Sequence, residues 1–64
     1  MNTFRKNLAR HVPKRTISKF AERAGITRAH LSFILSGKRQ PSMKVMEQLA
    51  KAARMPLYKL LKET

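Results

Sequence analysis

The chain has 64 residues, 15 Lys and Arg against 3 Asp and Glu, no cysteine, and a formal net charge of +12. Single domains usually comprise about 100 residues or more, so residues 1–64 are expected to form one small domain. The absence of cysteine excludes disulfides, thiolate zinc sites and thiol chemistry. His11 and His30 with scattered glutamates do not make a metal site either. A metabolite pocket of roughly 300 Å³ would consume much of so small a core, so we expect no enzyme, no cofactor and no small-molecule ligand.

The positive charge predicts a polyanionic partner, either nucleic acid or an anionic membrane surface. No apolar run approaches the ~20 residues that a membrane-spanning helix requires. The beginning of the chain, MNTFRKNLAR, lacks the continuous apolar segment of a secretory signal. We therefore expect a cytoplasmic protein that does not associate with membranes.

Proline and glycine divide the chain into five short segments with helical periodicity. In the first segment, apolar residues stand four apart: Phe4, Leu8 and Val12. Asn2 or Thr3 would cap this helix. Pro13 would stop it, because proline disfavours the helical conformation in the residue before it.

The second predicted helix spans Thr16 to Ala24, with Thr16 as its cap. Its apolar stripe consists of Ile17, Phe20, Ala21 and Ala24. Gly25 ends it, because glycine adopts the left-handed conformation at low cost. The third predicted helix runs from Arg28 to Ser36 after the cap Thr27. Its buried stripe consists of Leu31, Ile34 and Leu35, and the residue that ends it is Gly37.

Ser42 is expected to cap a fourth helix, and Pro56 separates it from a short fifth helix. The apolar residues of these two helices are Met43, Met46, Leu49, Ala50, Ala53, Leu57, Leu60 and Leu61. We interpret Met43, Met46 and Met55 as fillers of the core or of an interface, because they stand among apolar residues at helical spacing. The pattern predicts a compact all-α domain of five helices.

The second and third predicted helices are separated only by Gly25, Ile26 and Thr27, which is typical of a helix-turn-helix over residues 17–36. Ala21 would allow the two helices to approach closely, and Gly25 would permit the sharp turn. Ile26 would fill the corner of the turn, and the wedge between the helices would be filled by Phe20, Ala24, Leu31 and Ile34.

The stretch ISKFAERAGITRAHLSFILS, followed by GKRQPS, resembles the phage-repressor and Cro type of helix-turn-helix proteins. The resemblance extends through residues 43–61 and so covers nearly the whole chain. It implies a five-helix domain that binds double-stranded operator DNA as a symmetric dimer in a bacterial host cell. Two positions depart from the family: Ser42 stands where some relatives carry an arginine, and Arg54 stands near a position where many have glycine.

The third helix, residues 28–36, would enter the major groove with its amino-terminal residues near the base edges. We expect base contacts from Thr27, Arg28, Ala29, Ser32 and Phe33. Arg28 is the best reader of sequence, because its guanidinium matches guanine O6 and N7. Ala29 and Phe33 have no polar group and would read only shape or a thymine methyl. Alternatively, Phe33 folds partly back onto the first helix.

Phosphate contacts are expected to frame this helix. The candidates are Arg10, Lys14, Arg15, Thr16, Ile17, Ser18, Ser36, Lys38 and Arg39. The amides at residues 16–18 would present the positive end of a helix dipole to a phosphate. These contacts position the domain and carry little sequence information.

The chain stops soon after the fifth helix, which favours a stand-alone, Cro-like protein over a repressor with a second domain. Contacts of a homodimer would then come from Met55, Pro56, Leu57, Tyr58 and Leu61. The alternative is that these residues simply complete the core of the monomer. Such a dimer would be weak and assisted by DNA.

The sequence therefore predicts a sequence-specific transcriptional repressor that binds a palindromic operator. One alternative is the DNA-binding part of an antitoxin or of a restriction-modification controller, because such proteins share this domain. Another is a cationic protein that packages nucleic acid nonspecifically or acts on membranes. A membrane-surface helix needs no Ala21, Gly25 or Ile26, which argues against that last reading.

Overall fold

The computed structural model describes residues 2–62, which contain helices and no strand. In chain order these are α1 (Asn2–Ala9), the 3₁₀ turn η1 (Lys14–Thr16), α2 (Ile17–Ala24), α3 (Arg28–Ser36), α4 (Met43–Ala52) and α5 (Leu57–Leu61). The all-α fold with five α-helices predicted from the sequence is confirmed. The observed bounds of α3 coincide with the predicted ones.

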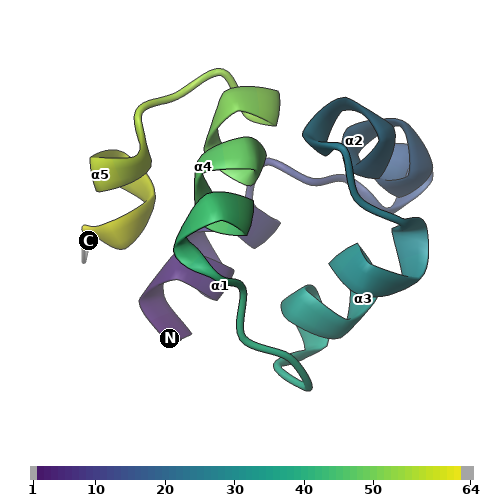
Figure 1. Ribbon diagram of the computed structural model, residues 1–64, viewed down its shortest axis with the longest axis horizontal. Helices are drawn as coiled ribbons and strands as arrows, with labels where there is room; N and C mark the ends of the chain where they lie inside the picture. The colour runs from purple at the N-terminus through teal and green to yellow at the C-terminus, as the bar shows by residue number, and fades with distance from the viewer. Residues whose placement is uncertain (1, 63–64) are drawn as a thin grey trace.

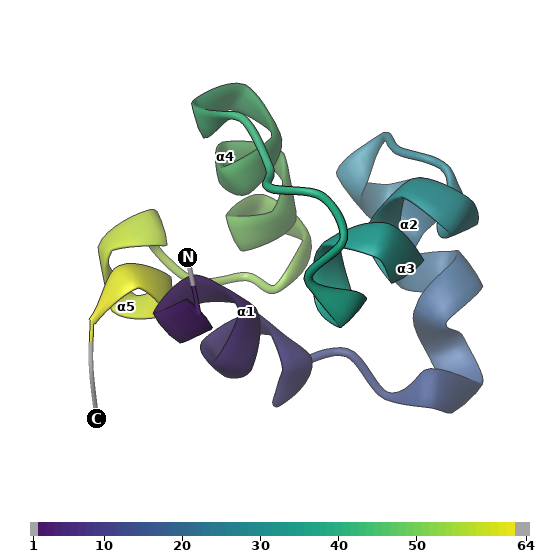
Figure 2. The same cartoon turned by 90° about the horizontal axis from the view of Figure 1, so that it is seen from below.

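The helices form a bundle measuring 26 × 24 × 22 Å along its principal axes. In Figure 1, α4 lies between α5 on one side and α2 on the other. Figure 2 shows α1 beneath α4 and beside α5, while α2 and α3 lie together at the opposite end. The packing pairs agree with these views, since α4 contacts both α2 and α5, and α1 contacts both α3 and α5.

One apolar core joins all five α-helices. Its largest fully buried side chains are Phe4, Leu8, Leu31, Ile34, Leu49 and Leu60. They come from α1, α3, α4 and α5, and α2 adds Phe20, Ala21 and Ala24. Because α3 inserts only one side into this core, its opposite side is left to solvent.

The first helix is shorter than predicted at its carboxyl end. It ends at Ala9, after which the amide of His11 donates to the carbonyl of Leu8 at 2.8 Å. A helix that continued into Pro13 would bring the proline ring against the carbonyl of Ala9, so the chain leaves the helix earlier. The predicted caps Asn2 and Thr3 are wrong, because both residues are helical and neither precedes α1.

Met43 is not a core residue, although its spacing in the sequence matched the apolar stripe of α4. Its side chain is 57% exposed, whereas Met46 is buried. Met43 is the first residue of α4, where Ser42 caps the helix by accepting a bond from the amide of Val45 at 3.2 Å. The buried face of α4 begins one turn later.

The connection from α4 to α5 turns on a left-handed arginine. Arg54 has a φ of 58° and is the only non-glycine residue among residues 2–62 with a positive φ. The amide of Met55 donates to the carbonyl of Ala50 at 3.1 Å, which satisfies the end of α4. Arg54 thus occupies a conformation that glycine adopts more easily.

Asn7 ties the two ends of the chain together. Its side-chain amide donates to the carbonyls of Leu60 and Lys62, at 2.8 Å in each case. These carbonyls belong to the last turn of α5 and to its C-cap, where the carbonyls of an α-helix have no partner within the helix. The side chain is only 8% exposed, so these bonds are largely shielded from water.

Candidate nucleic-acid interface

The turn between α2 and α3 has the geometry that the sequence predicts. Gly25 is left-handed, with a φ of 77°, and its amide donates to the carbonyl of Glu22 at 3.1 Å. The amide of Ile26 donates to the carbonyl of Ala21 at 3.0 Å. These bonds satisfy the end of α2 and turn the chain sharply into α3.

Both ends of α3 are held by local hydrogen bonds. At its start, the Thr27 hydroxyl accepts from the amide of His30 at 3.0 Å, as predicted for a cap. At its end, Gly37 has a φ of 86°, and the Phe33 carbonyl accepts from the amide of Lys38 at 2.9 Å. The Ser36 hydroxyl donates to the same carbonyl at 3.1 Å. The loop residues after α3 are therefore fixed relative to the helix.

The outward side of α3 carries the predicted base-contacting residues. Leu31 and Ile34 are buried, and Leu35 packs against the core. All five predicted base-contacting residues are exposed: Thr27, Arg28, Ala29, Ser32 and Phe33. They line the amino-terminal part and the outer face of one helix, which is the arrangement that entry into a major groove requires.

Phe33 points away from the core. Its side chain is 42% exposed, and the Lys38 ammonium lies 6.0 Å from the centre of its ring. An exposed aromatic ring beside a cation presents an apolar surface within a positively charged setting.

A shallow hollow of about 170 Å³ lies on this same side of α3. It is lined by Thr27, Ala29, His30, Phe33 and Arg39. Four of these residues belong to α3 or its cap, and Arg39 comes from the loop that follows. The lining is mainly apolar.

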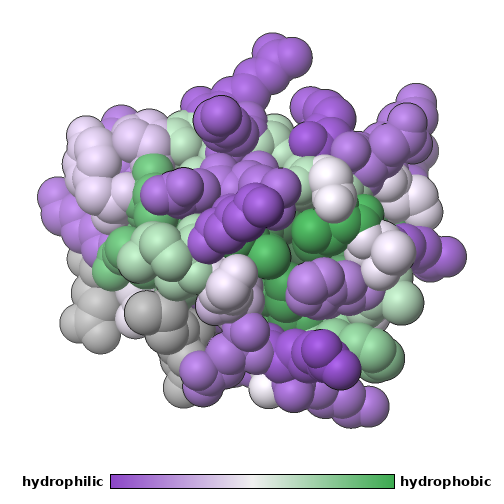
Figure 3. Space-filling model, in the orientation of Figure 1, coloured by the Kyte–Doolittle hydropathy of each residue, from purple (hydrophilic) through white to green (hydrophobic). Residues whose placement is uncertain are grey.

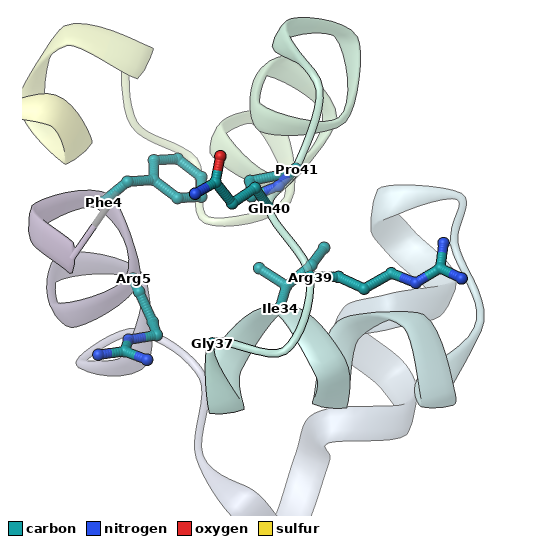
Figure 4. Close-up of a pocket in the computed structure, with 7 residues that line it drawn as sticks. All are labelled: Phe4, Arg5, Ile34, Gly37, Arg39, Gln40 and Pro41. Atoms are coloured by element: carbon teal, nitrogen blue, oxygen red, sulfur yellow. The ribbon is translucent and has the colours of Figure 1, made fainter.

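A second, smaller cavity of about 90 Å³ lies between α1 and the loop after α3. In Figure 4, Arg5 approaches Gly37 from α1, whereas the Arg39 side chain extends away from α1 on the other side of the loop. The Arg5 guanidinium occupies the space that a side chain at residue 37 would need. No local pattern predicts this role of Arg5, because the two residues are far apart in the chain.

The start of α2 differs from the prediction. The Thr16 side chain forms no capping bond, and η1 leads directly into the helix. The amide of Thr16 already donates to the carbonyl of Pro13 at 3.1 Å, so it is not one of the free amides predicted for a phosphate. Lys14, Arg15 and Ser18 are exposed around this turn, and Ile17 packs against the core.

The predicted phosphate contacts fall into separate groups. Ser36, Lys38 and Arg39 are exposed at the end of α3. Arg10 instead lines a hollow between α1 and α5, together with Met55 and Lys59. The structure therefore does not group Arg10 with Lys38 and Arg39 around α3.

The predicted dimer residues are divided between core and surface. Met55 and Leu57 pack against the core. Tyr58 is 65% exposed, Leu61 is 37% exposed, and Pro56 is exposed. Tyr58 and Leu61 are thus the large side chains of this group that the fold leaves exposed.

The hydrophilic surface is extensive. Figure 3 shows hydrophilic side chains projecting across one face of the molecule, with hydrophobic residues exposed between them. Within residues 2–62, no helix has the length and apolar character to cross a membrane. The same part of the chain holds no group of three His, Cys, Asp or Glu residues placed to bind a metal ion.

A helix-turn-helix family of the Cro/C1 type matches residues 13–60, which is most of the chain. The protein belongs to this helix-turn-helix family. No curated protein and no solved structure matches the chain. The family match and the geometry of α2 and α3 identify a regulator of transcription that binds double-stranded DNA.

Proposed function

We propose that the protein is a sequence-specific repressor of the Cro-like kind, which binds a palindromic operator as a homodimer. The observation that carries this proposal is the outward side of α3, where the predicted base-contacting residues are exposed on a helix held at both ends by hydrogen bonds. A rigid helix supports specific recognition because side chains reach base edges from fixed positions. Repression would follow from occupying a promoter, without catalysis.

Arg28 is proposed as the main reader of sequence. It is the first residue of α3 and is exposed, so its guanidinium can reach guanine O6 and N7 in the major groove. Ser32 lies one turn later on the exposed side and offers a hydroxyl. Thr27 accepts the capping bond from His30, and its hydroxyl proton and its methyl group remain available for a base edge.

Phosphate contacts are proposed on both flanks of α3. Lys14, Arg15 and Ser18 would act on one flank, and Ser36 and Lys38 on the other. The bond between the Lys38 amide and the Phe33 carbonyl supports a fixed position for the second group. Such contacts set the register of the protein on the duplex.

Homodimer contacts are proposed at α5, through Tyr58, Leu61 and Pro56. A small surface of this kind supports a dimer that forms mainly on DNA, where binding of both half-sites favours pairing. The half-sites are expected about one helical turn, ~34 Å, apart.

The proposal is tested by selecting binders from a random duplex library at ~0.15 M salt and titrating the winner against a scrambled duplex. We expect a palindromic winner that is bound at least ~10³-fold more tightly than the scrambled duplex. Equal and steeply salt-dependent binding to both duplexes would overturn the proposal and favour nonspecific packaging of nucleic acid. A selected site without two-fold symmetry would overturn the dimer.

Two variants separate base reading from phosphate binding. Arg28→Ala is expected to cost ~1–3 kcal/mol on the selected site and to relax the preference at one base position. Lys38→Ala should instead weaken binding to all sequences alike and reduce the salt slope by about one unit. An equal loss from Arg28→Ala on random DNA would make Arg28 a phosphate contact.

A further inference from the structure

The hollow on the outward side of α3 lies outside the apolar core. Its walls are the exposed Phe33 and Ala29, the capping residue Thr27, the half-buried His30, and Arg39 from the loop. Phe33 exposes 42% of its surface to water there, which is unfavourable for the free protein. An occupant with an apolar group would remove that cost.

The position of the hollow restricts what that occupant can be. It lies on the side of the helix that a helix-turn-helix protein presents to the major groove. In that groove, the C5-methyl group of a pyrimidine is the apolar feature of the base edges. Thymine carries this methyl group, and 5-methylcytosine presents the same group at the same place.

Arg39 adds a second chemical requirement. It lines the hollow together with Phe33 and Ala29, and Figure 4 shows its side chain extended away from α1. A guanidinium beside an apolar wall can donate to guanine O6 and N7 while the methyl group of a neighbouring base contacts the wall. The amide of Arg39 donates to the Phe33 carbonyl at 3.2 Å, which ties the arginine to the residue that forms the wall.

We propose that this hollow binds a C5-methylpyrimidine that adjoins a guanine, with Phe33 contacting the methyl group and Arg39 reading the guanine. This inference rests on the proposed function and makes it more specific. It moves Arg39 from the predicted phosphate contacts to a base edge. It also makes operator binding sensitive to methylation of cytosine wherever a cytosine is the pyrimidine that adjoins the guanine.

The experiment uses the duplex selected above and changes single methyl groups within it. Replacing each thymine in turn by uracil removes the C5-methyl group and leaves base pairing unchanged. In separate duplexes, the thymine–adenine pair beside the guanine is replaced by cytosine–guanine or by 5-methylcytosine–guanine. This pair of duplexes tests whether the methyl group of 5-methylcytosine is bound as that of thymine is. We expect one thymine per half-site to lose about fourfold in affinity as uracil, and 5-methylcytosine to exceed cytosine by a similar factor.

Variants assign these effects to the hollow. Phe33→Ala should bind the thymine and uracil duplexes within about twofold of each other, whereas Phe33→Leu should keep most of the discrimination because it retains an apolar wall. Arg39→Ala should lose about tenfold in discrimination for the adjacent guanine. Met43→Ala is the matched control, because it also truncates an exposed apolar side chain, which is 57% exposed on α4. It should retain the full effect of the methyl group.

Three results would overturn the inference while leaving the proposed function intact. They are equal binding of the thymine and uracil duplexes at every position, a selected site with no C5-methylpyrimidine next to guanine, and unchanged discrimination in Phe33→Ala. A library selection that yields no preferred sequence would instead refute the proposed function itself. Thermal unfolding of each variant verifies that it is folded, as expected for changes at exposed positions.

Discussion

The α2–α3 unit and the α1–α5 pair are held together in different ways. Within α2–α3, the turn and both ends of α3 are stabilised by bonds between residues three to six apart, such as Thr27 with His30. The α1–α5 pair depends on Asn7, whose bond to the Leu60 carbonyl spans 53 residues of sequence. The part that would contact DNA is therefore built from local signals, whereas the part that supports it relies on a contact between the chain ends.

The largest expected effect comes from a substitution that disrupts the non-local contact between α1 and α5. Asn7→Asp replaces a donor by a charged acceptor against two carbonyls, so it should cost about 3 kcal/mol or more of stability. For a domain of this size, that corresponds to a fall in Tm of roughly 12 °C or more.

Gln40→Glu is the control, because it makes the same change of amide to carboxylate on an exposed loop. It should change the Tm little. A Tm of Asn7→Asp close to that of the Gln40→Glu variant would mean that the bonds to α5 contribute little to stability.

The next largest effect is expected at Gly25, the left-handed residue of the turn between α2 and α3. Gly25→Val places a β-branched residue at a φ of 77°, which should cost at least ~1–2 kcal/mol. The added Cβ would meet Gln48 at 3.7 Å, an ordinary contact, so the cost comes from the backbone and not from crowding. Gly25→Asn should lose less, because asparagine tolerates this conformation. Equal Tm values for the two variants, measured by circular dichroism, would contradict this explanation.

Two threonines, one before α2 and one before α3, allow the capping of these two helices to be compared. Thr27→Ala removes an observed cap and should cost ~1 kcal/mol, whereas Thr16→Ala removes a side chain without a capping bond and should cost almost nothing. Urea unfolding of both variants measures the difference. Similar losses in the two variants would show that Thr16 caps α2 in solution.

The smallest expected effect concerns the third left-handed turn. Arg54→Gly should raise stability by about 0.5–1 kcal/mol, because glycine relieves the positive φ of 58° at some entropic cost. Arg54→Ala removes the same charge but keeps the Cβ atom, so it controls for electrostatics. If both variants gained equally in Tm, the gain would come from reduced charge repulsion and not from the backbone.

Most of the helices were predictable because their signals are local. Thr27 and Ser42 cap as expected, Gly25 and Gly37 are left-handed as expected, and the buried stripe of α3 follows the helical period. The errors also have physical causes. Thr16 was predicted as a cap, but the preceding 3₁₀ turn supplies the start of α2 instead. Met43 matched the period of the core, yet α4 reaches the core only after its first turn.

The sequence by itself determined the helix-turn-helix, because capping residues, glycines and apolar spacing act within a few residues of one another. Only the tertiary structure decided that Arg39 lines the hollow beside Phe33, that Arg5 packs against Gly37, and that Asn7 joins α1 to the end of α5. Each of these depends on where separate helices and loops meet. That arrangement follows from burying one shared core, and no local pattern encodes it.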